Sequence, residues 1–145
     1  MKTKFLLADD DADDADMFCE ALMRVGPEMQ CQTVDNGKSL FELLSATQFY
    51  KPDVIFLDIN MPIINGWECL KGLKEDARCN DIPAIMYSTS SARKDVEKAY
   101  KLGASLFLTK PEDFGELCQI LKVVAAHSGE SLVEGLSRFP SVKLQ

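Results

Sequence analysis

The sequence contains few of the residues from which common catalytic and metal centres are built. His127 is its only histidine, and it suggests no catalytic triad with a serine and an acid. The five cysteines are widely spaced and include no C-x-x-C pair, so we expect neither a zinc site nor a disulfide framework. We predict reduced, mostly buried thiols at Cys19, Cys31, Cys69, Cys79 and Cys118.

Long apolar segments and an excess of positive charge are also absent. No apolar run approaches the roughly 20 residues that a membrane-spanning helix needs. The first apolar run, Phe5–Ala8, is too short for a signal peptide, so we expect a cytoplasmic protein without membrane contact. The net charge of −7 disfavours binding to phosphate backbones, so direct DNA binding is not expected. A length of 145 residues predicts one domain.

Acidic residues are instead concentrated near the N-terminus. Seven fall between Asp9 and Glu20, and the next basic residue is Arg24. Those from Asp11 onwards suit the start of a helix, where the dipole favours negative charge, and Asp11 is positioned to cap it. Asp9 and Asp10 precede that helix and directly follow an apolar run. Their mutual repulsion predicts a nearby cation, a bound proton or a basic partner.

Short apolar runs alternate with segments of helical periodicity along the chain. All but the second run are apolar throughout, which is typical of strands covered on both faces of a parallel sheet. We predict strands over Phe5–Ala8, Cys31–Asp35, Val54–Leu57, Ala84–Tyr87 and Leu106–Leu108. We predict helices over Ala12–Val25, Lys38–Phe49, Gly66–Asp76, Ala92–Leu102 and Phe114–His127. This order indicates an α/β fold with a doubly wound, five-stranded parallel sheet and five helices.

Polar side chains follow four of these strands where each strand ends. Asp9 and Asp10 follow the first strand, Asp58 the third and Ser88 the fourth, and Lys110 comes just after the fifth. In a doubly wound sheet these ends meet along one edge, where ligands bind. Carboxylates suit Mg²⁺ together with phosphate oxygens, and an aspartate can itself attack phosphorus. A hydroxyl and an ammonium can then stabilise the transferred phosphoryl group.

Together these motifs resemble the receiver domain of the bacterial two-component response-regulator family, over roughly residues 3–127. Asp9-Asp10 resembles the family's acidic pair, and Asp58 in D-I-N-M-P-x-x-N-G its phosphoacceptor segment. Ser88 resembles its Thr/Ser position, and Lys110-Pro111 a Lys-Pro pair that typically has a cis peptide bond. The separations also fit, with 30 residues from Asp58 to Ser88 and 22 from Ser88 to Lys110. The resemblance implies a flavodoxin-like fold with strand order 2-1-3-4-5.

By the same resemblance, Asp58 is the residue that accepts a phosphoryl group from a histidine kinase or phosphotransfer protein. The implied cofactor is Mg²⁺. The resemblance implies that the carboxylates of Asp10 and Asp58 and the backbone carbonyl of Asn60 bind this ion, with Asp9 acting partly through water.

The remaining site residues resemble the parts that respond to phosphorylation. Lys110 is expected to pair with Asp58 at rest and with phosphate after transfer, and Ser88 to bond a phosphate oxygen. Phe107 resembles the aromatic switch that turns inward when Ser88 moves. The output surface, formed by Ala92–Leu102, Phe107 and Phe114–His127, is then expected to bind a downstream protein.

The C-terminal residues extend past this domain. We assign residues 1–128 to the receiver domain and 129–145 to a short tail that is either one helical turn or disordered. Because this tail is too short for a DNA-binding or enzymatic domain, we expect a single-domain regulator that signals by binding a partner. Apolar residues at roughly helical spacing could dock the tail on the domain or on a second copy, as a homodimer: Leu132, Val133, Leu136 and Phe139.

Three alternative functions account for parts of the same pattern. A degenerate receiver would act as a scaffold without phosphorylation, although this chain has all five key side chains. A phosphatase of the haloacid-dehalogenase type needs D-x-D, and here Asn60 stands in place of its second acid. A flavodoxin-like flavin binder would have hydroxyls and amides where three acids follow the first strand. We therefore expect a signalling switch that is not an enzyme, apart from its own phosphoryl transfer and dephosphorylation.

Overall fold

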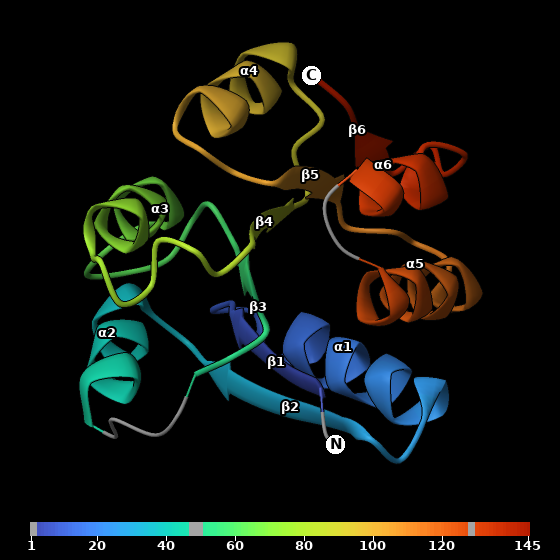
Figure 1. Ribbon diagram of the computed structural model, residues 1–145, viewed down its shortest axis with the longest axis horizontal. Coiled ribbons are helices and arrows are strands. Elements are labelled where there is room, and N and C mark those ends of the chain that lie inside the picture. The colour runs from blue at the N-terminus through green and yellow to red at the C-terminus, as the bar shows by residue number, and fades with distance from the viewer. Residues whose placement is uncertain (1–2, 47–50, 128–129) are drawn as a thin grey trace.

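A mixed sheet of six strands forms the centre of the molecule over the residues that the structure describes (Figure 1). The structure is a computed structural model that describes residues 3–46, 51–127 and 130–145. The strand order is β2-β1-β3-β4-β5-β6, with β6 antiparallel to β5 and the other neighbours parallel. The strands are β1 (Thr3–Ala8), β2 (Met29–Val34), β3 (Val54–Leu57), β4 (Ala84–Ser88), β5 (Leu106–Thr109) and β6 (Val142–Lys143).

Helices cover both faces of this sheet (Figure 1). Helices α1, α5 and α6 pack on one face, and α2, α3 and α4 pack on the other. None of these helices is long and apolar enough to span a membrane. The helices are α1 (Ala12–Val25), α2 (Gly37–Ala46), α3 (Gly66–Glu75), α4 (Arg93–Lys101), α5 (Phe114–Ala126) and α6 (Glu130–Leu136).

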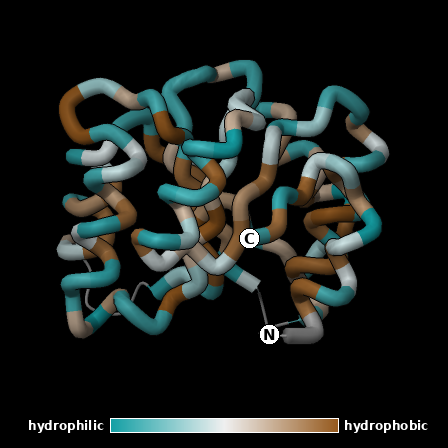
Figure 2. The backbone as a smooth tube through the Cα atoms, turned by 90° about the horizontal axis from the view of Figure 1, so that it is seen from above, coloured by the Kyte–Doolittle hydropathy of each residue, from teal (hydrophilic) through white to brown (hydrophobic). Residues whose placement is uncertain are grey.

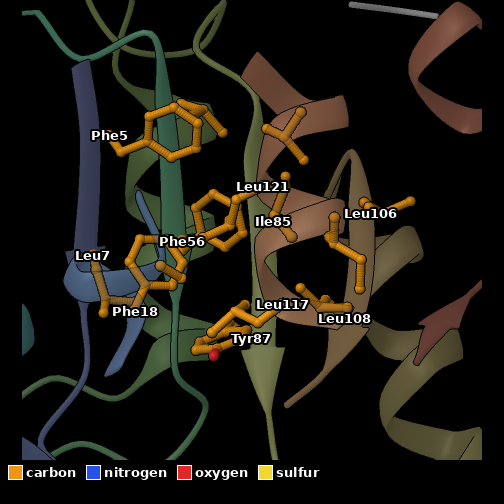
Figure 3. Packing of buried hydrophobic residues seen from close by; sticks show 14 of the residues in the cluster. Phe5, Leu7, Phe18, Phe56, Ile85, Tyr87, Leu106, Leu108, Leu117 and Leu121 are labelled. Carbon is orange, nitrogen blue, oxygen red and sulfur yellow. The ribbon is translucent and has the colours of Figure 1, made fainter. Parts of the chain in front are cut away.

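Two apolar cores form because successive strand side chains point to opposite faces of the sheet. Phe5 and Leu7 of β1 face α1 and α5, whereas Leu6 and Ala8 face the helices on the other side. Hydrophobic segments accordingly run through the interior of the molecule, and hydrophilic ones lie mostly on its outer turns (Figure 2). In the first core four aromatic rings contact one another, with centroids 4.9–6.4 Å apart (Figure 3): Phe5, Phe18, Phe56 and Tyr87.

The structure confirms the predicted α/β architecture and the order of the first five strands. The limits of α1 agree with the prediction, and those of the other predicted helices differ by at most one residue where both are described. Phe49, the predicted end of the second helix, lies outside the described residues. Asp11 caps α1 as predicted, because its side chain accepts a hydrogen bond from the amide of Asp14 at 3.0 Å.

The C-terminal segment is more ordered than the expected single turn or disordered tail. It forms helix α6 and strand β6, which account for the sixth helix and sixth strand. Four of its apolar side chains are at most 7% exposed because they pack against α5 and the end of the sheet: Leu132, Leu136, Phe139 and Val142. Val133, also predicted to dock, is instead 39% exposed. The segment is therefore part of the fold.

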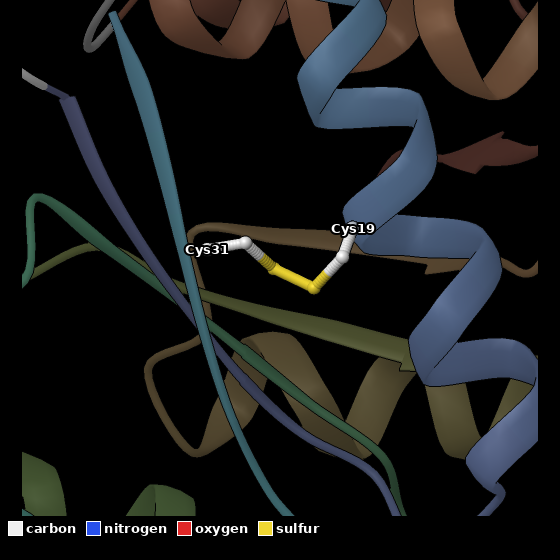
Figure 4. Close-up of a disulfide and its surroundings, with 2 residues drawn as sticks. All are labelled: Cys19 and Cys31. Carbon is white, nitrogen blue, oxygen red and sulfur yellow. A yellow bond between two sulfur atoms is a disulfide. The ribbon is translucent and has the colours of Figure 1, made fainter.

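A disulfide joins α1 to β2 and corrects the prediction that all five cysteines are reduced (Figure 4). Cys19 and Cys31 have Cα atoms 5.7 Å apart, within the range for such a bond. The pair forms because α1 packs directly against β2, so that residues 12 positions apart face one another. Cys69 and Cys79 are free and buried, as predicted, and Cys118 is free and half-buried.

Candidate functional site

The carboxyl ends of β1 and β3 place Asp9 and Asp58 beside each other. Backbone hydrogen bonds extend to these ends, from the amide of Asp9 to the carbonyl of Val34 at 3.0 Å and from the amide of Asp58 to that of Ala8 at 2.9 Å. Both aspartates are buried, with 2% and 7% exposure, whereas Asp10 is exposed. The ends of the two strands therefore hold two carboxyl groups in the interior, with a third at the solvent edge.

These three aspartates form a group that suits a divalent cation. One carboxylate oxygen from each of Asp9, Asp10 and Asp58 lies within 4.8 Å of the other two. Oδ2 of Asp9 is buried and accepts no aligned hydrogen bond among the described residues, although the ammonium of Lys110 lies 2.8 Å away, so a lone pair remains available for an ion. Hard oxygen ligands of this kind are the ones that Mg²⁺ prefers. Asn60 lies exposed in the loop after β3, and its carbonyl as a ligand stays a prediction.

The start of α3 packs closely against the backbone of Asp58. The amide of Gly66 donates to the carbonyl of Ile59 at 2.8 Å, and Asn65 caps the helix by accepting from the amide of Glu68 at 2.9 Å. A Cβ atom on Gly66 would collide with the carbonyl oxygen of Asp58. The close approach thus requires the glycine of the Asn-Gly pair, and the asparagine caps the helix.

Lys110 is the cation that approaches the acids. Its side chain is only 10% exposed, and its Nζ lies 2.8 Å from Oδ2 of Asp9 and 3.9 Å from Oδ2 of Asp58. The contact with Asp9 is close enough for an ion pair but is not aligned as a hydrogen bond. Lys110 donates an aligned hydrogen bond of 2.8 Å to Asp14 instead. The expected pairing with Asp58 is therefore the longest of three contacts, and the sequence did not indicate Asp14.

Burial and charge set the protonation of this group. Burial raises the pKa of Asp58 to about 7, and the negative charges of Asp9 and Asp10 add to this rise while Lys110 opposes it. Burial by itself lowers the pKa of Lys110, but the hydrogen bond to Asp14 and the close contact with the Asp9 carboxylate outweigh it, so the net shift is upward. The lysine stays charged. Near neutral pH the Asp58 carboxyl group is protonated in part of the molecules.

Ser88 and Phe107 occupy neighbouring strands near this edge. Ser88 ends β4, is 2% exposed, and its hydroxyl oxygen accepts from the amide of Ser90 at 3.1 Å. The carbonyl of Ser88 accepts from the amide of Lys110 at 2.7 Å, which ties the end of β4 to the lysine. Phe107 is fully buried on the face of β5 that packs against α3 and α4. It therefore lies in the inward position, and its exchange with an outward one stays a prediction.

The peptide bond between Lys110 and Pro111 differs from the expectation drawn from the resemblance. It is trans in the structure.

The C-terminal segment covers part of the expected output surface. Strand β6 pairs with the outer edge of β5, and α6 packs on α5. Tyr100 of α4 links the two strands, because its hydroxyl donates to the carbonyl of Lys143 at 2.6 Å and accepts from the amide of Phe107 at 3.2 Å. The edge of β5 between α4 and α5 is thus occupied by the chain itself.

The chain is similar in sequence to known proteins. Residues 5–122 match the family model described as the response regulator receiver domain. A chemotaxis protein, CheY1 of Helicobacter pylori, is 31% identical over 83% of this chain and 95% of its own length. The transcriptional regulatory protein DegU of Brevibacillus brevis is 33% identical over 78% of this chain and 48% of its own length. The chain therefore spans about half the length of some of its curated relatives.

A solved structure also resembles the whole described fold, including α6 and β6. The phosphorylated cyanobacterial phytochrome response regulator RcpA matches 99% of this chain and 100% of its own, with a TM-score of 0.78 and 26% identity.

Proposed function

Because the chain belongs to the response regulator receiver domain family, we propose that it is a signalling switch operated by phosphorylation of Asp58. One observation carries this proposal. A buried carboxylate at the end of β3 lies within 4.8 Å of two other carboxylates and 3.9 Å from the ammonium group of Lys110, whose side chain is 10% exposed. Family membership supports phosphorylation-based signalling, and this constellation supports Asp58 as the acceptor.

The side chains of the site have distinct roles in the proposed transfer. A carboxylate oxygen of Asp58 attacks the phosphorus of a phosphohistidine, so that a P–O bond forms, the P–N bond breaks and its electron pair returns to the imidazole. Lys110 provides positive charge beside the transferred oxygens, and the Ser88 hydroxyl provides a hydrogen bond. Burial of Asp58 limits the access of water to the product.

A Mg²⁺ ion fits the same group of oxygens. Asp10, Asp58 and the carbonyl of Asn60 would hold it directly, and Asp9 partly through water. When bound, the ion supplies positive charge that offsets the repulsion between the carboxylates and the incoming phosphoryl group.

The proposed phosphoryl donor is a histidine kinase or a phosphotransfer protein. Among these, we favour a kinase of the phytochrome type, because the likeness to the phytochrome response regulator RcpA covers 99% of this chain. Phosphotransfer in vitro from a purified phytochrome-type kinase, compared with a chemotaxis kinase, tests this choice: equal rates would contradict it.

The proposal differs from the two other classes of function. A phosphorylation-independent scaffold would not need a buried acid with an elevated pKa, and a phosphatase of the haloacid-dehalogenase type would need a second acid at Asn60. We therefore propose a switch that works in the cytoplasm and turns over no separate substrate. Its phosphorylated form binds a downstream protein.

Fluorescence of Trp67 tests the proposed function. Trp67 is the only tryptophan and lies half-buried at the start of α3. The ammonium group of Lys98 lies over its ring, 4.8 Å from the centroid. We expect a saturable change with Mg²⁺ and a second change when beryllofluoride, which mimics the phosphoryl group, is added. Asp58→Asn should abolish the second change.

Asp81→Asn is the matched control, because Asp81 is exposed and precedes β4 at the opposite end of the sheet. A wild-type protein that shows no second change contradicts the proposal.

A further inference from the structure

Lys110 contacts an acid that lies outside the group of strand-end residues. Its Nζ lies 2.8 Å from Asp9 and 2.8 Å from Asp14, but 3.9 Å from Asp58. Among the described contacts of this ammonium group, only the one with Asp14 has the geometry of a hydrogen bond. The group that must reach the phosphoryl oxygens is thus held closer to Asp9 and Asp14 than to Asp58.

Helix α1 presents Asp14 to the lysine. The amide of Asp14 donates to the capping side chain of Asp11, which fixes the first turn of the helix. The side chain of Asp14 is 34% exposed, whereas its neighbours Asp13 and Asp16 are exposed on the solvent side. Below the lysine lies the ring of Tyr87, with its centroid 5.5 Å from Nζ. The ammonium therefore rests between a buried ring and the carboxylates of Asp9 and Asp14.

We propose that Asp14 is a positioning residue that holds Lys110 away from Asp58 before phosphorylation. Activation must then break the contact between Asp14 and Lys110, and this contact therefore favours the inactive state. This inference rests on the proposed function of Asp58. A phosphoryl group brings three acceptor oxygens and about −1.5 to −2 charges to Asp58, and they draw the ammonium toward them. The Asp14 contact is then made mainly in the unphosphorylated state, and an interaction made in only one state shifts the balance between the two.

Asp14 also affects the metal-binding oxygens. Without the Asp14 carboxylate, Lys110 would pair with Asp9 and Asp58 alone. The carboxylate oxygens of these two residues are the ones that a metal ion needs. Asp14→Asn should therefore weaken the binding of Mg²⁺ and strengthen that of beryllofluoride at saturating Mg²⁺. Opposite changes of this kind are not expected from a purely structural defect.

Titrations followed by Trp67 fluorescence test the inference. We expect Asp14→Asn to bind beryllofluoride about three- to tenfold more tightly than wild type, which is the range for one partly exposed charge-assisted hydrogen bond. Asp13→Asn is the matched control, since it removes an exposed charge from the same turn of α1. Asp14→Glu should retain most of the wild-type behaviour.

The decisive comparison uses the Lys110→Met background. If Asp14 acts through the lysine, adding Asp14→Asn to Lys110→Met changes Mg²⁺ affinity no more than adding Asp13→Asn does. If wild type responds to beryllofluoride but Asp14→Asn and Asp13→Asn bind it and Mg²⁺ equally well, the inference is overturned and the proposed function stands. The same holds if the effect of Asp14→Asn on Mg²⁺ affinity persists in the Lys110→Met background. A wild-type chain that does not respond to beryllofluoride contradicts the proposed function, and the inference falls with it.

Discussion

At the scale of single residues, we expect the proposed phosphoacceptor, Asp58, to be a source of instability in the metal-free protein. Asp58 is buried with two further acids nearby, and burial raises its pKa from the ordinary 3.8 to about 7. Its folded-state pKa thus lies above its unfolded-state value, so the folded protein binds more protons between these two pH values. The contribution of Asp58 to stability is favourable at low pH and is lost as pH rises from about 4 to about 7.

Asp58→Asn should remove this dependence. In the presence of EDTA, we expect the substitution to raise the free energy of unfolding by about 1–2 kcal/mol at pH 8 and to change it little at pH 5, because an amide does not ionise. Urea unfolding at the two pH values measures this. Asp81→Asn, at an exposed site, should show no such gain. The account is contradicted if Asp58→Asn retains the wild-type fall in stability between pH 5 and pH 8.

A second residue carries backbone strain beside the site. Ile63 has a φ of 71°, and a hydrogen bond of 2.8 Å from the amide of Ile64 to the carbonyl of Pro62 closes a tight turn around it. A β-branched residue is unusual in this conformation, which costs about 1–2 kcal/mol. The side chain is 71% exposed, so it gains little from burial in return.

Ile63→Gly should therefore stabilise the protein. We expect the free energy of unfolding to rise by about 0.5–1 kcal/mol, because relief of strain exceeds the extra entropy that glycine gives the unfolded chain. Met23→Gly is the control: it changes an equally exposed apolar residue inside α1 and should destabilise by about 1 kcal/mol. Chemical denaturation compares the two. A loss of stability in Ile63→Gly would show that the loop needs the side chain.

At the scale of elements, Tyr100 connects the C-terminal strand to the strand of the predicted switch residue. Thr109 donates directly to the carbonyl of Ser141 at 2.8 Å, but two residues earlier the Tyr100 hydroxyl stands between the amide of Phe107 and the carbonyl of Lys143. A side chain from α4 thus replaces one bond of the β5–β6 ladder. Helix α4, β5 and β6 are thereby joined at one point.

Tyr100→Phe should loosen β6 without unfolding the domain. It leaves a backbone amide and a carbonyl without their partner, at a cost of about 1–3 kcal/mol. We expect amide hydrogen exchange at Phe107 and Thr109 to become about tenfold faster, since β6 protects this edge and 1.4 kcal/mol corresponds to a factor of ten. Amides of the central strand β3 serve as the internal reference. Unchanged exchange at the β5 edge would show that the hydroxyl does not hold β6 in place.

The sequence predicts regular elements better than their contacts with other parts of the chain. The first five strands and five helices follow from apolar runs and helical periodicity, which are local signals. The tail residues Leu132, Leu136 and Phe139 show the same periodicity, but a strand of two residues, β6, leaves almost no pattern. The Cys19–Cys31 bond depends on how α1 lies across β2, and spacing alone does not give that distance.

At the scale of the whole molecule, parallel strands explain why most of the site could be predicted. A doubly wound sheet brings its strand ends to one edge, so Asp9, Asp58 and Ser88 could be grouped before any contact was known. Asp14 could not, because on α1 it looks like any other acid in the first turn of a helix. The distances that set the pKa of Asp58 and the position of Lys110 also depend on side-chain packing.

The intact mass of the protein after incubation with acetyl phosphate tests the central claim most directly. In the presence of Mg²⁺, we predict that wild type gains the mass of one phosphoryl group, that EDTA prevents the gain, and that Asp58→Asn shows none. The small donor makes the result independent of any kinase. A wild-type protein that stays unmodified although it binds Mg²⁺, or an Asp58→Asn variant that is modified to the same extent, would contradict the account.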